Sequence, residues 1–277
     1  MKKVFFILLL SLCLPDNNKI LESNYPLGRD KDPKTITDIS KFKLWYLKTQ
    51  WEVLSLPGLR FMTNLIYPKS TISHIETTDS IVAFTIDDGF CGLDNPDGCM
   101  INEVRELFKE YNAKATFFTT GSHCHNANRN DVLKLLDDGH ELANHGMFDY
   151  PYNEFNYEDF KNDLELTESI LQSYTNNIPK FYRAPHAKLS KTMQKVLDEK
   201  GLTHFVCDAF ASDTSIPDPV WISDYILNKV QPGSIVLIHM PEKNIREWNY
   251  RAMELTLKRL KEMNYKIVTL SELNNLK

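Results

Sequence analysis

Two neighbouring carboxylates, Asp87 and Asp88, directly follow the apolar run 81–86 and precede Gly89. The run predicts a buried strand, so both side chains emerge where that strand ends. Because adjacent side chains of a strand point in different directions, one carboxylate can bind a metal ion while the other faces the water that the ion activates. A solvent-exposed Asp-Asp-Gly turn is the alternative interpretation of this motif taken alone.

A histidine and a carboxylate stand four residues apart in the segment 139–149, at His145 and Asp149. One turn of helix would place both side chains on one face, where they could bind one metal ion together. His140 belongs to the same segment and fits a core or capping role better than the role of a ligand.

A second group of potential ligands is formed by His123 and His125, which flank Cys124. They follow the apolar run 115–119 and are predicted to lie in a loop. Either histidine could serve as an alternative metal ligand if that loop folds over the site.

The elements that must position these side chains begin near residue 80. From there, short apolar runs alternate with longer amphipathic segments, which is typical of repeated β-α units around a largely parallel sheet. In such folds, polar residues at the carboxyl ends of the strands converge on one face. The expected strands are 81–86, 115–119, 180–182, 204–207, 235–238 and 266–269, and the expected helices are 102–111, 157–174, 191–200, 221–229 and 250–263.

The first 13 residues resemble an export signal, because Lys2 and Lys3 precede an apolar run that is too short to span a bilayer. A small residue on either side of Leu12 offers a cleavage site, and a buried first strand or helix is the alternative. We expect a secreted or cell-surface protein, with membrane contact only through this segment if it stays uncleaved.

Residues 14–79 are predicted to form a linker followed by a helical extension. The stretch 17–34 is polar and contains Pro and Gly. The stretch 37–54 carries an apolar stripe at near-helical spacing, which we expect to pack on its own domain, with a membrane-surface role as the alternative. The stripe consists of Ile39, Phe42, Tyr46 and Val53, with Trp45 and Trp51 beside it.

Charge and cysteine content narrow the possible partners and the environment. The net charge is -5, from 37 acidic and 32 basic residues, and no basic run is present that could follow a phosphate backbone, so nucleic acid is not an expected partner. Cleavage after Cys13 would leave four cysteines, which can pair in three ways or stay as free thiols. Among Cys91, Cys99, Cys124 and Cys207, the first two are the nearest pair.

Taken together, the motifs resemble those of the NodB-type polysaccharide deacetylases, carbohydrate esterase family four, over residues 80–273. That family carries T-[FI]-D-D-G, H-[ST]-x-x-H, R-x-P-[FYW], an Asp-containing segment and L-x-H, in this order. The matching positions in this chain are 85–89, 145–149, 183–186, 211–213 and 237–239. The resemblance implies a distorted (β/α) barrel, with residues 80–277 as the catalytic domain.

The resemblance also assigns the main chemical roles. It makes Asp88 and His145 metal ligands, Asp87 the general base and His239 the general acid, and it makes Arg183 the residue that orients Asp87. A divalent ion would acidify its bound water and polarise the acetamide carbonyl. The base would then take up one proton, and the acid would deliver another to the leaving amine.

Three further positions follow from the same resemblance. Asp213 matches the carboxylate that pairs with the acid histidine, with Asp208 as a nearby alternative. Leu237 would line the pocket for the acetyl methyl group. The backbone N–H of His186 would stabilise the oxyanion, although the family has an aromatic residue at this position.

The second departure from the family pattern is Asp149, which stands where the family has its second metal-binding histidine. A carboxylate can still bind a divalent ion, so we expect Asp149 to be the third ligand. Zinc is the leading expectation for the metal, and because two carboxylates relatively favour harder metals, cobalt and manganese are the alternatives.

The expected function is therefore removal of N-acetyl groups from N-acetylhexosamine units of a polysaccharide such as chitin or peptidoglycan. A catalytically silent carbohydrate-binding protein on the same fold is one alternative, motivated by the departures at Asp149 and His186. An N-acyl amidohydrolase with a non-carbohydrate substrate is another.

Overall fold

The computed structural model describes residues 39–54, 59–93 and 95–277 of the chain. The expected leader 1–13 and the linker 17–34 lie outside the described residues. Within the described part, no helix is both long and apolar enough to cross a lipid bilayer.

The centre of the fold is one sheet in the order β5-β4-β3-β2-β1-β7-β6, and β8 pairs with β1 as an eighth strand. All pairings between these strands are parallel, as the alternation of apolar runs and amphipathic segments predicts. The strands are β1 (Ile81–Asp87), β2 (Ala115–Thr119), β3 (Glu141–Asn144), β4 (Phe181–Tyr182), β5 (Thr203–His204), β6 (Ala209–Phe210), β7 (Ile235–Leu237) and β8 (Lys266–Val268).

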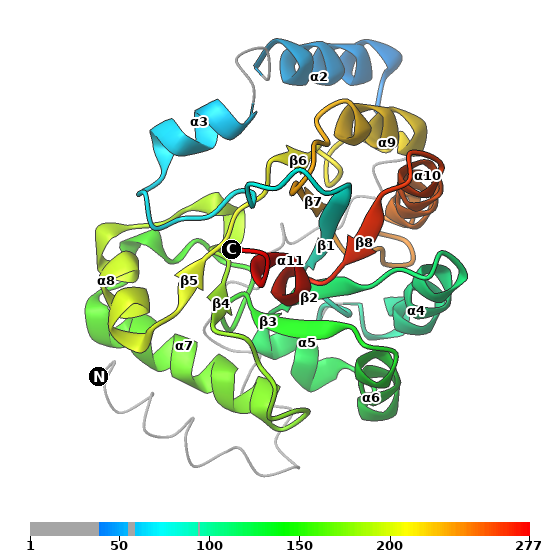
Figure 1. The fold of residues 1–277 in the computed structure, drawn as a ribbon. Helices are drawn as coiled ribbons and strands as arrows, with labels where there is room; N and C mark the ends of the chain where they lie inside the picture. Colours follow the sequence, from blue (N-terminus) through cyan, green and yellow to red (C-terminus); the bar gives the residue numbers. More distant parts are fainter. Residues whose placement is uncertain (1–38, 55–58, 94) are drawn as a thin grey trace.

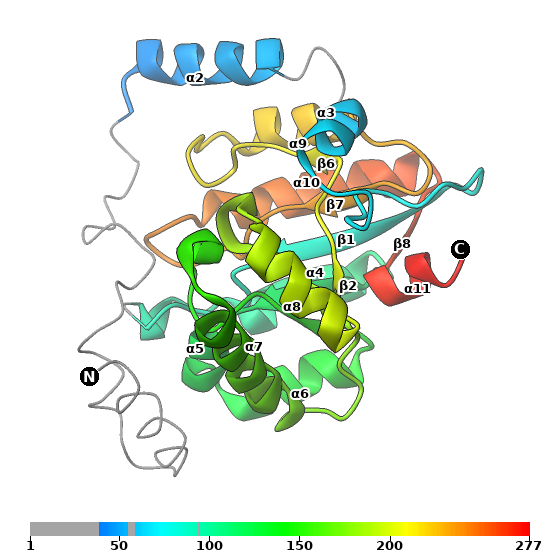
Figure 2. The same ribbon diagram turned by 90° about the vertical axis from the view of Figure 1, so that its left-hand side faces the viewer.

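Helices surround this curled sheet, as Figures 1 and 2 show, and the predicted distorted (β/α) barrel is confirmed. The α-helices are α2 (Lys41–Leu54), α3 (Leu59–Ile66), α4 (Ile101–Glu110), α5 (Gly121–Asn126), α6 (Arg129–Asp137), α7 (Tyr157–Gln172), α8 (Lys191–Lys200), α9 (Pro219–Leu227), α10 (Trp248–Glu262) and α11 (Leu270–Asn274). Short 3-10 turns are η2 (Pro96–Gly98), η3 (Tyr152–Glu154) and η4 (Pro185–Ala187).

Strand β1 is buried along its whole length, which explains its unbroken apolar sequence. Its residues alternate between two clusters, because successive side chains of a strand point to opposite faces. Val82 and Phe84 pack in the main core with residues of α4 and α10, whereas Ala83 packs on the other face. The two halves of β1 pair with different strands along one edge: Ile81–Ala83 with β8, and Phe84–Asp87 with β2.

Helix α8 occupies the predicted range 191–200 because both of its ends carry strong local signals. The hydroxyl of Ser190 accepts a hydrogen bond from the backbone N–H of Met193 at 3.2 Å, which caps the first turn. Gly201 ends the helix in the left-handed conformation, with φ 66°.

Two predictions of local structure are wrong. The segment 139–149 is not helical, because Glu141–Asn144 forms strand β3 between β2 and β4. The segment holds too few apolar residues to predict a strand, and pairing on both sides decides its conformation. The expected loop at His123 is helix α5, whose N-cap hydroxyl at Thr120 accepts a hydrogen bond from the His123 N–H.

The apolar stripe of α2 does not pack on the domain as expected, because Phe42, Tyr46 and Val53 are all more than half exposed. The helix instead packs through Trp51, whose ring contacts Phe210 edge-on at 5.7 Å between centroids. A bond from Lys48 to Asp218 ties the same helix to the N-cap of α9. Contacts across the chain, rather than the periodicity of the stripe, therefore decide which side of α2 faces the domain.

Candidate active site and metal centre

The two carboxylates at the end of β1 are buried and point to different partners, as the sequence predicts. Asp87 is the last strand residue and Asp88 adopts the left-handed conformation, with φ 52°, which aspartate tolerates better than most residues. Their exposed fractions are 5% and 4%. This turn directs Asp87 toward Arg183 and Asp88 toward Arg246 and His145.

The three predicted metal ligands come together. One ligand atom from each of Asp88, His145 and Asp149 can be chosen so that all three lie within 4.8 Å of one another. The Nε2 atom of His145 lies 3.8 Å from Asp88 Oδ1. Its Nδ1 atom donates to the backbone carbonyl of Arg183 at 2.9 Å, which leaves the Nε2 lone pair for an ion. Two carboxylates and one imidazole nitrogen fit a divalent cation with positions left for water and substrate.

His145 and Asp149, four residues apart, are brought together by a tight turn and not by a helix. Gly146 has φ 81° and donates its N–H to the side chain of Asn144 at 2.8 Å. The next backbone N–H groups are held by Asp163 and Tyr152, at 2.9 and 2.8 Å. These bonds turn the chain back, so that Asp149 reaches the other two ligands.

Arg183 contacts Asp87, the contact that its predicted role requires. Its Nη1 atom donates to Asp87 Oδ1 at 2.5 Å and to the hydroxyl of Thr85 at 2.9 Å. The guanidinium lies over the ring of Phe118, 4.0 Å from its centroid. The second oxygen of Asp87, Oδ2, lies 4.0 Å from His145 Nε2 and so faces the ligand group.

His239 pairs with Asp213 and not with the alternative, Asp208. Its Nδ1 atom lies 2.9 Å from Asp213 Oδ1, whereas Asp208 accepts hydrogen bonds from Arg60 and from the backbone of Ile235. Burial alone would lower the pKa of His239, but Asp213 and the carboxylates at the end of β1 raise it to about 9. This shift favours the protonated form of His239 at neutral pH, which is the form that a general acid needs.

Arg246 is a site residue that sequence reasoning missed. Its Nη2 atom lies 2.9 Å from Asp88 Oδ2 and 3.4 Å from Glu242, and its Nε donates to the carbonyl of Met240 at 2.7 Å. Burial opposes ionisation of Asp88, but Arg246 and nearby histidines hold the pKa of Asp88 well below its ordinary value. The only sequence signal was an acidic and a basic residue four apart, a pattern typical of exposed surfaces.

Asp149 differs from Asp88 in its electrostatic surroundings. Burial, followed by the charge of Asp88, raises the pKa of Asp149 to about 7. Two carboxylates share the centre of the site, so a positive charge between them stabilises both ionised forms. A divalent cation would supply this positive charge.

The histidines considered as alternative metal ligands lie outside the candidate ligand group. His123 donates from Nδ1 to the backbone carbonyl of Asp88 at 3.3 Å, and neither it nor His125 belongs to the candidate ligand group of the described residues. His140 is a buried core residue, as expected, and accepts a hydrogen bond from the backbone of Ala115.

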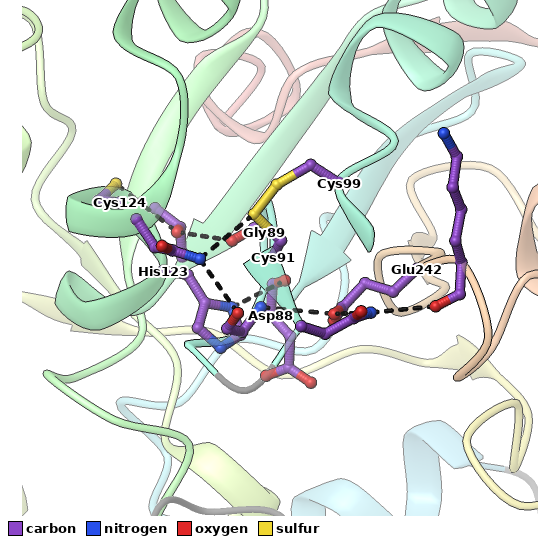
Figure 3. The surroundings of a disulfide bond; sticks show 12 residues. Asp88, Gly89, Cys91, Cys99, His123, Cys124 and Glu242 are labelled. Atoms are coloured by element: carbon purple, nitrogen blue, oxygen red, sulfur yellow. Dashed lines mark hydrogen bonds between the residues drawn. A yellow bond between two sulfur atoms is a disulfide. The ribbon is translucent and has the colours of Figure 1, made fainter. Parts of the chain in front are cut away.

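The nearest cysteine pair, Cys91 and Cys99, forms a disulfide, while Cys124 and Cys207 are buried free thiols. Figure 3 shows this disulfide beside Asp88, with His123 on one side and Glu242 on the other. The cross-link closes the loop that directly follows the Asp-Asp-Gly turn. Glu242, fully buried, accepts hydrogen bonds from this loop and also contacts Arg246.

One pocket of about 720 Å³ contains all the predicted site residues. Its walls also include Trp51, Ile66 and Tyr67 from the N-terminal extension, which sequence reasoning did not connect with the site. The nine predicted residues that line it are Asp87, Asp88, His145, Asp149, Arg183, His186, Asp213, Leu237 and His239.

Comparison with known proteins gives a consistent result. Residues 74–205 match the polysaccharide deacetylase family model. The chain is 28% identical over 203 residues to a peptidoglycan-N-acetylglucosamine deacetylase of Bacillus cereus, covering 72% of this chain and 90% of that protein. It is 26% identical over 197 residues to a bifunctional xylanase/deacetylase of Pseudobutyrivibrio xylanivorans, covering 71% of this chain but only 31% of that longer protein.

Solved structures share the fold. A crystal structure of a peptidoglycan N-acetylglucosamine deacetylase superimposes with a TM-score of 0.67 at 22% identity, covering 77% of this chain and 95% of the other. A family-four pseudoenzyme from Bacillus anthracis superimposes with a TM-score of 0.65 at 20% identity, covering 75% and 69%. The matched segment and the shared fold lead to one conclusion: this chain contains a NodB-type polysaccharide deacetylase domain.

Proposed function

We propose that this protein is a metal-dependent hydrolase that removes N-acetyl groups from N-acetylhexosamine units of a polysaccharide, with peptidoglycan and chitin as the candidate polymers. The proposal rests mainly on one observation: the candidate ligand group, the carboxylate of Asp87 and the imidazole of His239 all line one pocket. The names of the peptidoglycan deacetylases among its relatives support the substrate class.

In this mechanism, Asp88, His145 and Asp149 would hold the divalent ion. When bound, the ion lowers the pKa of its water from about 15.7 toward about 7 and polarises the substrate carbonyl. Asp87 accepts the proton of the attacking water through Oδ2, the oxygen that faces the ligand group. Arg183 fixes the other oxygen of Asp87 and so keeps the base in position.

The second half of the reaction uses His239. Its proton passes to the amine as the carbon–nitrogen bond breaks, which leaves acetate and a free amino sugar. Asp213 holds the ring by accepting from Nδ1, so Nε2 is the atom that can face the substrate. Leu237 lines the pocket at the place proposed for the acetyl methyl group.

The candidate ligands bear on which metal is preferred. Two carboxylates and one histidine are harder, as a set, than one carboxylate and two histidines. We propose zinc as the first candidate, and because the ligand set is harder, we expect cobalt and manganese to compete more effectively than at a site with two histidines.

The alternative function is that of a catalytically inactive carbohydrate-binding protein. The family-four pseudoenzyme from Bacillus anthracis, which has a similar fold, supports this alternative. This chain keeps Asp87, Arg183 and His239 in contact with the partners that proton transfer requires. A protein that only binds sugar needs none of these contacts, so their presence favours an enzyme.

The test combines metal analysis with product analysis on the purified full chain. We expect about one divalent ion per chain and acetate release from chitooligosaccharides or peptidoglycan, with release abolished by a chelator and restored by added metal. Hydrolysis of only a small N-acyl amide would favour the non-carbohydrate alternative. A chain that holds no metal and releases no acetate would be a binding protein.

We further propose that residues 1–13 direct the protein out of the cytosol, to a secreted or cell-surface location. The lysine pair and the short apolar run support this. Fusion of these residues to a reporter enzyme should export the reporter, and the same fusion with aspartates replacing two central leucines should not. A reporter that stays in the cytosol would contradict the proposal.

A further inference from the structure

The two positions at which this chain departs from the family motifs, Asp149 and His186, contact each other. His186 Nε2 lies 3.2 Å from Asp149 Oδ1, although the two residues come from different motifs and different turns. In the family pattern these positions hold a metal-binding histidine and an aromatic residue. In this chain the aromatic position holds His186, and its imidazole lies against the carboxylate of Asp149, which occupies the position of the metal-binding histidine.

The local backbone brings His186 to this place. It lies in η4 with φ 54° and ψ 18°, and the following Ala187 is also left-handed, with φ 57°. Non-glycine residues adopt this conformation only when surrounding contacts hold it. Tyr67 supplies one such contact by donating its hydroxyl to the carbonyl of Ala187 at 2.7 Å, and the backbone N–H of Ala187 bonds to Ala184 at 3.1 Å.

The other two candidate ligands are each held in a comparable way. Asp88 has Oδ2 against Arg246 at 2.9 Å, while its Oδ1 faces His145. His145 has Nδ1 on the carbonyl of Arg183. Ligands of a bound metal are generally fixed by such outer partners, which set their orientation. For Asp149, the partner in the equivalent position is His186.

We propose that His186 is a positioning residue for the third metal ligand, and that its presence depends on that ligand being Asp149. One carboxylate oxygen is held by His186 and the other is left for the ion. A histidine at position 149 would bind through a ring nitrogen and would have no use for this partner. The two departures are therefore one joint change, and the inference rests on the proposed metal-dependent function.

A surface ion pair is the competing explanation, because the His186 side chain is 43% exposed and that of Asp149 is 20% exposed. Exposed pairs contribute little, and removal of one partner is usually without effect. The two explanations differ in their consequence for metal binding, which can be measured without reference to turnover.

The experiment is a double-mutant cycle on metal affinity in the full-length chain. Wild type, His186→Phe, Asp149→His and the double variant are stripped of metal and titrated with zinc and with manganese against a competing chelator. We expect His186→Phe to weaken binding by about 10–100-fold in the Asp149 background. In the Asp149→His background, the same change should leave affinity unaltered, and zinc should be preferred over manganese more strongly than in wild type.

Two controls separate positioning from general damage. His186→Asn, whose amide can donate to Asp149, should recover part of the affinity lost in His186→Phe. His125→Phe, which changes an exposed histidine outside the ligand group, should bind metal as wild type does. Circular dichroism and thermal unfolding verify that each variant is folded.

Equal affinity of wild type and His186→Phe would overturn the inference, as would an equal loss in both backgrounds or a wild type that binds no metal. The proposed function fails in a different way. If the cycle shows coupling but the wild-type chain releases no acetate, His186 positions Asp149 in a metal-binding protein that is not a deacetylase. If acetate is released and the cycle shows no coupling, only the role of His186 is wrong.

Discussion

Replacement of Asp87 by asparagine is expected to lower turnover by about 10²–10⁴-fold, the usual contribution of a proton-transfer group, while the metal content stays at the wild-type level. An amide cannot accept the proton of the attacking water, but its oxygen can still accept the hydrogen bond from Arg183. Asp87 lies outside the candidate ligand group, so the ion should stay bound. Acetate release and metal content measured on the same preparation test both halves.

Asp88→Asn is the matched control, because it alters the neighbouring carboxylate at the same strand end. This variant should lose metal and activity together, since Asp88 belongs to the ligand group. If Asp87→Asn keeps near-wild-type turnover, the base must be sought elsewhere. If it loses metal as Asp88→Asn does, the two carboxylates do not have separate roles.

The second large effect concerns stability and Arg246. Arg246→Met is expected to lower the free energy of unfolding of the metal-free protein by about 3–5 kcal/mol, the usual result of removing one partner of a buried ion pair. Arg246 is 7% exposed, and its guanidinium contacts two buried carboxylates, Asp88 and Glu242. Both would lose a compensating charge in surroundings that exclude water. Chemical denaturation at neutral pH gives the change directly.

A second substitution and a matched control make this prediction specific. Adding Glu242→Gln to Arg246→Met removes one of the two carboxylates and should restore part of the lost stability. Arg251→Met removes an exposed arginine paired with Glu254 and should cost less than about 1 kcal/mol. Similar losses for the two arginine variants would show that the buried contacts of Arg246 contribute nothing special.

The sequence predicts those elements whose signal is local. Strand β1 is a continuous apolar run, and α8 has a serine at its start and a glycine at its end, so both were placed within one residue. Strand β3 has no such signal, because its pairing partners on β2 and β4 decide its conformation. The prediction of a helix through His145 and Asp149 is therefore wrong, although the proximity of these two residues that their four-residue spacing predicts is present.

The residues of the site likewise divide into those that have a local sequence signal and those that do not. Each predicted residue belongs to a motif whose spacing can be recognised, and all of them reach one pocket. Arg246 and Trp51 belong to no such motif. Their positions depend on contacts between segments far apart in the chain, such as Arg246 with Asp88 and Trp51 with Phe210. The contact of His186 with Asp149 has the same origin.

Trp51, Ile66 and Tyr67 form part of the pocket wall, so they affect where a functional fragment of this protein can begin. All three residues precede residues 74–205, the segment that the family model matches, and Asp213 and His239 follow that segment. A fragment trimmed to residues 74–205 would keep the ligand group but lose the acid and one side of the cavity. The smallest piece able to do the proposed chemistry is thus larger than the segment that the family model matches, and its borders are set by the cavity.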